Sequence, residues 1–443
     1  MQQLAGIRDT LRMTGREWRT FGDDRYRTYR RIGGSAAVVS ALAGDGLTIP
    51  LLLALGAHPA VATVIGVLPF AFSSAQLAVP GLLRRSGGNL RAVTLGILAV
   101  GETRGFILAA VTLLAWARVI PSPVAIAGIA AVMCIGGAAT TIGGTNLLAW
   151  YGAVLPDPER RFVAPRVMGI TLGLGAVLLL PVALIVQGAL AVIGIRVYAI
   201  VFAIAGVAGI VELLVVARLQ NPGRVRVAAR GSAPVRTPAL DGFIKIISVA
   251  AFGAGIGPYL SIYAISVLHL PPGFAILLAA LSSAASLVSS TIVGSLLARG
   301  SASRTLRVSF LLRGGSMILG LLALPANPLA WLVLCAVAAT AAAGAAAGIL
   351  ASNERLLRLT AGSDLIGAQG RFVAGTALGL TVGQMANGVL LAVLPLGYPA
   401  FAILFGVSGV TRFITAARVE VSETWASSTM VHRIDDLKPP KPG

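Results

Sequence analysis

Twelve long apolar stretches alternate with short polar segments along the chain, and each stretch is long enough to cross a membrane as a helix. A hydrocarbon core of about 30 Å needs roughly 20 apolar residues in helical conformation. The pattern therefore predicts an all-α integral membrane protein with twelve transmembrane helices. The predicted spans are 33–56, 60–83, 93–117, 122–148, 167–190, 194–217, 243–268, 273–298, 305–325, 328–350, 372–394 and 397–417.

The composition agrees with this pattern, because 56% of the residues are hydrophobic and only 12% are charged. The net charge of +19 does not indicate nucleic-acid binding, since the basic residues lie between the apolar runs without interleaved aromatic residues. Two cysteines inside apolar runs and three isolated histidines have no metal-ligand spacing. We therefore expect no cofactor and no metal site.

The basic residues predict the orientation. Arginines crowd the N-terminal segment and alternate loops, whereas the opposite side holds only Arg118 and Arg196, so both termini are expected in the cytoplasm. Arginine outnumbers lysine 32 to 3, which indicates GC-rich bacterial codon usage and hence a bacterial inner membrane. The predicted parts are a basic segment at 1–31, a six-helix bundle at 32–217, a cytoplasmic linker at 218–241, a second six-helix bundle at 242–417 and a cytoplasmic tail at 418–443.

The basic segment 1–31 places apolar residues at helical spacing among its arginines. This pattern is typical of a helix lying on the anionic inner leaflet, with lipid as its partner, and the alternative is a disordered positive tail.

The two bundles carry traces of a duplication. The tetrapeptide RFVA occurs at 161–164 and again 210 positions later at 371–374, and the sequences around both copies continue in step. Other landmarks match at nearly the same offset: His58 with His269, Gly44-Asp45-Gly46 with Gly255-Ile256-Gly257, and Arg104-Gly105 with Arg313-Gly314. The halves are therefore expected to be two pseudo-symmetric bundles.

This organisation resembles the major facilitator superfamily of secondary transporters. The resemblance rests on the two six-span halves, on the loop LPDPERRFVAPR at 155–166 and its copy at 362–375, and on GLLRRSGG at 81–88, a weak form of the family's loop motif in which Arg84 stands in place of an aspartate. The corresponding basic positions are Arg84, Arg85, Arg161 and Arg371. The resemblance implies alternating access by a monomer, with spans 1, 4, 7 and 10 lining the cavity.

Asp45 is the leading candidate for chemistry. It lies 14 residues beyond Arg31, about 21 Å of helix, and therefore near the bilayer centre. A carboxylate at that depth is expensive and by default functional, although a structural carboxylate neutralised by an arginine is the alternative. Arg104 is expected at similar depth and is the predicted partner, with Arg313 at the equivalent place in the second half.

Glu102 is the second candidate for proton coupling, and a structural role is equally open for it. On a continuous helix it would lie roughly opposite Arg104. Glu212, six residues from Arg218, is expected near the cytoplasmic interface without a role. Uncharged polar residues inside spans mark either cavity positions or helix packing: Thr145, Tyr259, Tyr263, Gln384 and Asn387.

The sequence thus predicts a secondary transporter of a small molecule, proton-coupled through Asp45, with a preference for export of hydrophobic or cationic compounds. Two alternatives remain: a non-transporting assembly or lipid-handling factor with the same fold, and a transporter that takes up or exchanges an organic anion. No nucleotide-binding motif and no enzyme motif is found, so an enzyme is not expected.

Overall fold

The computed structural model describes residues 18–224, 237–253, 257–299, 302–360 and 365–435. Within these ranges the regular elements are helices, apart from one isolated bridge between Asn89 and Arg224. Residues 1–17 of the predicted surface segment and residues 225–236 of the predicted linker lie outside the described residues.

The first half of the chain forms a bundle of interrupted helices. Its elements are η1 (Asp24–Tyr26), α2 (Arg27–Leu42), α3 (Asp45–Ala54), α4 (Pro59–Phe72), η2 (Ser73–Ala78), α5 (Val79–Arg85), α6 (Leu90–Glu102), α7 (Arg104–Trp116), α8 (Ser122–Val132), η3 (Met133–Gly137), α9 (Ala138–Val154), α10 (Asp157–Ile193) and α11 (Arg196–Val216).

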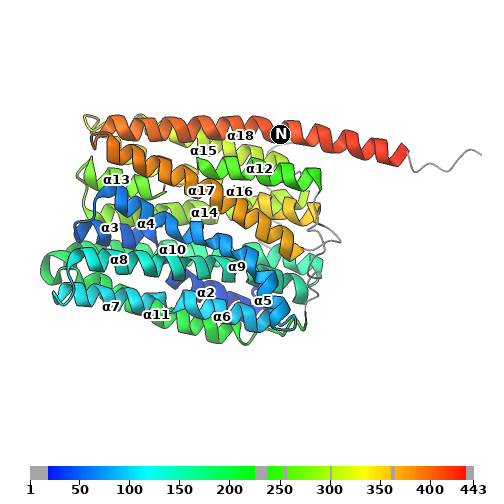
Figure 1. The fold of residues 1–443 in the computed structure, drawn as a ribbon, viewed down its shortest axis with the longest axis horizontal. Coiled ribbons are helices and arrows are strands. Elements are labelled where there is room, and N and C mark those ends of the chain that lie inside the picture. The colour runs from blue at the N-terminus through cyan, green and yellow to red at the C-terminus, as the bar shows by residue number, and fades with distance from the viewer. Residues whose placement is uncertain (1–17, 225–236, 254–256, 300–301, 361–364, 436–443) are drawn as a thin grey trace, which may run out of the picture.

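The second half has fewer interruptions. It consists of α12 (Pro238–Phe252), α13 (Gly257–Ser266), α14 (Pro272–Arg299), α15 (Ala302–Gly320), α16 (Ala330–Leu359), α17 (Leu365–Val393) and α18 (Tyr398–Asp435). The helix of the twelfth predicted span continues well past residue 417, and α18 extends beyond the ends of its neighbours (Figure 1).

Nine helices of the described residues are long and apolar enough to cross a membrane. The other three predicted spans do not each form one helix that is long and apolar enough, for reasons that differ from span to span. Span 60–83 turns into the 3-10 segment η2, span 243–268 is divided between α12 and α13, and span 305–325 corresponds to α15, a helix of 19 residues with arginines along it.

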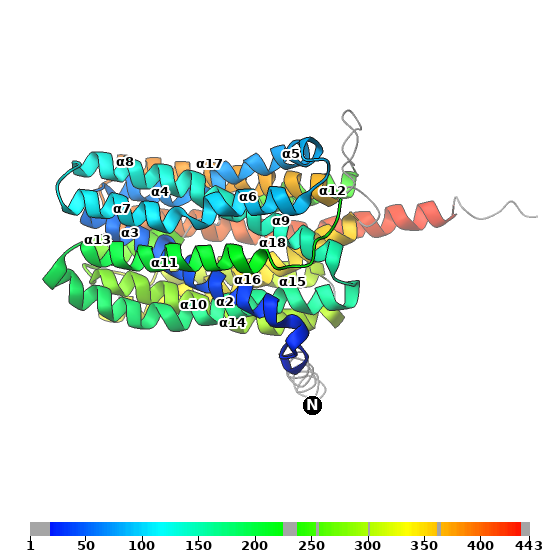
Figure 2. The same ribbon diagram turned by 90° about the horizontal axis from the view of Figure 1, so that it is seen from below.

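The helices of both halves run side by side along one axis in both views (Figure 1 and Figure 2), with the first half below and the second half above in Figure 1. The halves meet where α10 packs along α14 and where α4 and η2 pack along α17. At the end opposite the linker, one apolar core contains Leu51 and Tyr198 of the first half and Ile276 of the second. At the linker end each half has its own core, around Trp150 and around Phe243. The two halves therefore share one apolar core at the end opposite the linker, and the contact between them is most extensive at that end.

Candidate functional site

The first predicted span is interrupted immediately before Asp45. Helix α2 ends at Leu42 and Gly44 adopts an extended conformation, so Asp45 becomes the first residue of α3. Helix α3 then continues through Pro50. A Cβ at Gly44 would lie 2.4 Å from the Ser40 carbonyl oxygen, so the turn requires glycine. The interruption places a carboxylate at a helix N-terminus, where free N–H groups and the helix dipole favour negative charge.

Asp45 faces a small cavity between the two halves. Its volume is about 150 Å³, with α10 on one side and α14 on the other. The lining residues are Ser40, Ala41, Gly44, Asp45, Gly46, Thr171, Leu172, Gly175, Leu179, Ala279 and Ser283. The halves touch at its edge, since a Cβ on Gly46 would lie 2.8 Å from the Cβ of Ala279. A relative movement of the halves therefore changes the size of this cavity.

Arg104 is buried near Asp45 but is not in direct contact with it. The two interact electrostatically, yet no ion pair joins them among the described residues. The Arg104 guanidinium instead donates a 2.8 Å hydrogen bond from Nη1 to the hydroxyl oxygen of Thr140. Its stem packs against Gly136, where a Cβ would lie 2.8 Å from the Arg104 Cβ. The predicted direct pair is thus replaced by an arginine held between the third and fourth spans.

Glu102 and Glu212 both lie close to Arg104. The third span is interrupted at Thr103, so Glu102 ends α6 and Arg104 begins α7. Only Thr103 separates the two helices, and Glu102 lies against Gly209 of α11 whereas Arg104 lies against Gly136 of η3, which agrees with the expectation that they face roughly opposite sides. Glu212 was expected at the interface, but it is only 6% exposed and interacts electrostatically with Glu102 and Arg104. The close packing of α11 on α6, which a single sequence does not reveal, buries it.

The second half carries a basic counterpart. Arg313 packs against Gly344 of α16, as Arg104 packs against Gly136 of η3. The two glycines are 208 positions apart in the sequence and the two arginines are 209 apart, so the contact is repeated in the second half. Arg313 lies near Arg412 of α18, which is 1% exposed and lies 5.6 Å from the ring centroid of Phe310. Arg412 was missed, although its charge inside the predicted span 397–417 was a visible signal.

The structure brings three of the five predicted polar candidates together and separates Tyr263 and Thr145 from them. The Tyr259 hydroxyl donates a 3.2 Å hydrogen bond to the Gln384 carbonyl oxygen, and the Tyr259 side chain also hydrogen-bonds Asn387. Tyr263 points elsewhere: its hydroxyl donates to the Ala323 carbonyl oxygen, and its ring centroid lies 4.8 Å from that of Phe401. Both tyrosines are fully buried, so neither lines a cavity in this conformation.

Thr145 lies where the halves meet near the linker end. Its hydroxyl donates to the Thr141 carbonyl oxygen, and its own carbonyl oxygen accepts a 3.5 Å hydrogen bond from Gln369 of the second half. Beside it, Gln76 Nε2 donates a 3.0 Å hydrogen bond to Asn146 Oδ1, and both amides are buried. Sequence reasoning missed this amide pair, because a single Gln and a single Asn in apolar spans show no spacing.

The basic loop positions do not gather into one site. Arg84 and Arg85 are exposed at the end of α5, and the Arg161 side chain lies outside the described residues. Arg371 forms an ion pair with Asp241, which joins α17 to α12 within the second half.

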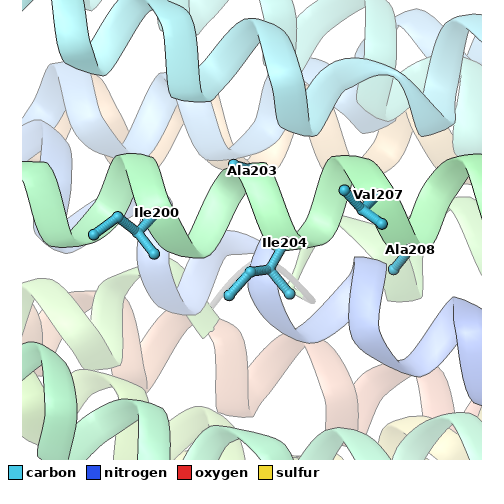
Figure 3. A pocket seen from close by; sticks show the side chains of 5 residues that line it. All are labelled: Ile200, Ala203, Ile204, Val207 and Ala208. Carbon is cyan, nitrogen blue, oxygen red and sulfur yellow. The ribbon is translucent and has the colours of Figure 1, made fainter.

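A second depression lies on the outside of the molecule. It has a volume of about 500 Å³ and is lined by five apolar side chains of α11 alone (Figure 3). Ile200, Ile204 and Val207 are each more than half exposed there, which is typical of a lipid-facing helix surface. In the part of the chain that the structure describes, no group of three or more His, Cys, Asp or Glu is arranged to hold a metal ion.

Several solved transporter structures are similar to this chain over most of its length. A bacterial homologue of the iron transporter ferroportin in an outward-facing state is 14% identical, covers 90% of this chain and 99% of its own, and superposes with a TM-score of 0.60. The nucleoside transporter NupG is 13% identical, with 89% and 98% covered and a TM-score of 0.61. A POT family transporter in complex with a thioalcohol-conjugated peptide is 13% identical, with 90% and 95% covered and a TM-score of 0.64.

The chain has the major facilitator fold. No protein-family model and no curated protein matches it by sequence. At 13 to 14% identity the likeness concerns the fold alone, and what the three proteins carry is a property of those proteins. The major facilitator fold nevertheless explains the two similar halves and the cavity between them.

Proposed function

We propose that this protein is a secondary active transporter that moves a small molecule across the cytoplasmic membrane by alternating access, coupled to protons through Asp45. One observation carries the proposal: an interrupted helix presents an intramembrane carboxylate to a cavity whose walls come from both halves. Interrupted helices at the interface of structural repeats are where secondary transporters bind substrates and coupling ions. The three structural neighbours, which are transporters by their descriptions, support the same class.

The proposed cycle uses the two halves as rigid bodies. In the closed state Gly46 of α3 lies against Ala279 of α14, and Asp45 faces the cavity between them. Rocking of the halves opens this contact to one side or the other. A proton bound by Asp45 neutralises the carboxylate when the cavity is narrow, and water entering the open cavity stabilises the ionised form.

The chemistry around Asp45 supports a hydrophobic or cationic substrate, and we propose that such compounds are exported. Its cavity combines one carboxylate with hydroxyl and aliphatic side chains, namely Ser40, Thr171, Ser283, Leu172 and Leu179. An organic anion is the second candidate substrate, and the observation that favours it is that the half-buried Arg313 lies near the buried Arg412. The remaining candidate function is a non-transporting assembly or lipid-handling factor with this fold.

We further propose that the protein works as a monomer in a bacterial inner membrane, with both termini in the cytoplasm and the functional boundaries at 1–31, 32–217, 218–241, 242–417 and 418–443. The basic linker and loops support this orientation. No enzymatic reaction is part of the proposal.

Reconstitution tests the proposal. Proteoliposomes with an imposed pH gradient are offered a panel of hydrophobic cations, neutral compounds and organic anions, and accumulation is compared between wild type and Asp45→Asn. We expect gradient-driven movement of a cation or hydrophobic compound by wild type and only downhill exchange by Asp45→Asn. Glu354→Gln, which changes a surface carboxylate paired with Arg358, is the matched control.

Each other outcome has a definite meaning. Movement of anions alone supports the second candidate substrate. Folded protein that moves nothing in the panel favours the non-transporting factor. Accumulation by Asp45→Asn with wild-type pH dependence removes Asp45 as the coupling group.

A further inference from the structure

A second group of buried acidic side chains lies behind the Asp45 cavity, inside the first half. Glu102 at the end of α6 is 1% exposed and Glu212 on α11 is 6% exposed. The helices meet closely here, because a Cβ on Gly209, one turn before Glu212, would lie 3.0 Å from the Glu102 Cβ. Arg104 interacts electrostatically with both carboxyl groups. Three elements therefore bring two acids and one base together away from lipid and water.

The charges of this group do not balance without a proton. Two ionised carboxylates and one guanidinium leave a net charge of −1, whereas one bound proton makes the group neutral. Arg104 attracts both carboxylates electrostatically. Glu102 also repels the Glu212 carboxylate. Two like charges that share a buried site do not both ionise, because neither is solvated. A proton held by one of the two acids is the least costly solution.

Buried polar atoms without hydrogen-bond partners also indicate that this group binds a proton. Glu102 Oε2 and Arg104 Nε are buried without hydrogen-bond partners, and so is the hydroxyl of Tyr151, which is 3% exposed and interacts electrostatically with Glu212. Buried polar atoms are normally hydrogen-bonded, so three orphans around two acids indicate that a proton or water completes the group. The acids are not gathered as a metal site among the described residues.

A row of tyrosine rings leads from this group toward the linker end of the bundle. The ring centroids of Tyr151 and Tyr29 lie 5.2 Å apart, and those of Tyr29 and Tyr26 lie 6.4 Å apart. The Tyr26 hydroxyl donates a 3.2 Å hydrogen bond to Glu159, whose carboxylate also pairs with Arg25 at 2.6 Å. This line runs from a partly exposed carboxylate to Glu212 without passing through the cavity.

We infer that Glu102 and Glu212 form a second proton-binding site, separate from Asp45, that holds one proton between the two carboxyl groups beside Arg104 and exchanges it with the cytoplasm along Tyr151, Tyr29 and Tyr26. Binding takes a proton from water and forms an O–H bond on one carboxylate oxygen, and release returns the proton to water. The titratable and charged groups that act on the pair are Arg104, Tyr151 and, through Arg104, Asp45. Its use in transport rests on the proposed function, whereas proton binding itself does not.

Infrared difference spectroscopy on the purified full-length protein tests the inference without transport. All variants carry Asp45→Asn, which removes the other proton-binding carboxylate. This background at neutral pH is expected to show the carbonyl stretch of a protonated, buried carboxylic acid, which is lost on raising the pH. Adding Glu102→Gln or Glu212→Gln leaves a single carboxylate beside Arg104, so both are expected to lose this band at neutral pH. Adding Glu354→Gln is expected to keep it. A background without the band, or its persistence after either buried substitution, overturns the inference.

Thermal stability gives an independent readout if a variant expresses poorly. Glutamine resembles a protonated glutamic acid, so each single variant is expected to keep a melting temperature close to wild type. The double variant Glu102→Gln/Glu212→Gln leaves Arg104 without either acid and is expected to melt several degrees lower. Single variants that lose as much stability as the double variant show that both acids must be ionised, which contradicts a shared proton.

The access route has its own test. Tyr151→Phe removes the hydroxyl next to Glu212 and is expected to slow the appearance of the infrared signal after a pH jump, with unchanged amplitude. Tyr198→Phe, a buried tyrosine elsewhere on α11, is the control. Equal rates in wild type and both variants remove the tyrosines from the route. Loss of transport with these signals intact contradicts only the proposed function.

Discussion

Gly209 of α11 lies directly against the backbone of Glu102 in α6, so that a Cβ at Gly209 would lie only 2.3 Å from the Glu102 carbonyl oxygen. This contact is where the third and sixth spans approach most closely around the buried acids. It explains how Glu212, one turn further along α11, comes to lie beside Glu102 and Arg104. Because glycine has no side chain at position 209, the two helices pack closely enough to bring Glu212 beside Glu102 and Arg104.

Gly209→Ala is therefore expected to separate α6 from α11 and to lower the stability by about 1 to 3 kcal/mol, the usual cost of overpacking. Gly144→Ala is the matched control, because a Cβ at Gly144 meets nothing within 4 Å. Thermal unfolding of both variants in detergent measures the difference. Equal melting temperatures mean that the helices adjust at no cost.

Arg104 is expected to be the most sensitive charged residue of the first half. Arg104→Ala leaves buried carboxyl groups without their cation, and breaking one side of a buried ion pair costs about 3 to 5 kcal/mol. Adding Glu102→Gln is expected to recover more expression and thermal stability than adding Asp45→Asn, since Asp45 faces the cavity. Greater recovery with Asp45→Asn indicates that Asp45 is the main partner of Arg104.

Trp18 is expected to hold the linker end of the two halves together. It packs against Arg166, whose guanidinium lies 4.9 Å from the ring centroid, and reaches Gly169, beside which Leu287 of the opposite half also lies. Trp18→Ala removes this packing, so a cysteine at position 287 should react faster with maleimide. Trp116→Ala, whose ring lies under Arg196, is the control. An unchanged rate means that Trp18 does not restrain this end.

The orientation is testable by paired labelling after Cys134 and Cys335 are replaced by alanine. Asn221 at the start of the linker and Ser122 at the start of α8 are both exposed, and the arginine distribution places them on opposite sides of the membrane. In intact cells, membrane-impermeant maleimide is expected to label Ser122→Cys but not Asn221→Cys. The reverse pattern inverts the topology.

Local patterns were sufficient for several properties of this protein. Hydrophobic runs of membrane length, the arginine distribution and the repeated RFVA segment predict a helical membrane protein of two similar halves, because helix formation and insertion depend on neighbouring residues. The superposition on transporter structures confirms that fold. Asp45 stands out as a candidate for the same reason, since a lone carboxylate deep in an apolar run is costly wherever the helix packs, and its role stays a prediction.

Only the tertiary structure decided which charged residues meet. Glu102 packs against Gly209 of α11 and Arg104 against Gly136 of η3, and the packing of α11 on α6 buries Glu212. Helix α18 brings Arg412 near Arg313. The sequence predicts similar depths for Asp45 and Arg104, because depth along a helix follows from the rise of 1.5 Å per residue. The direction in which a side chain points around its helix depends on interruptions of the helix and on the neighbouring helix that packs closest. Both are set by contacts between segments far apart in the chain.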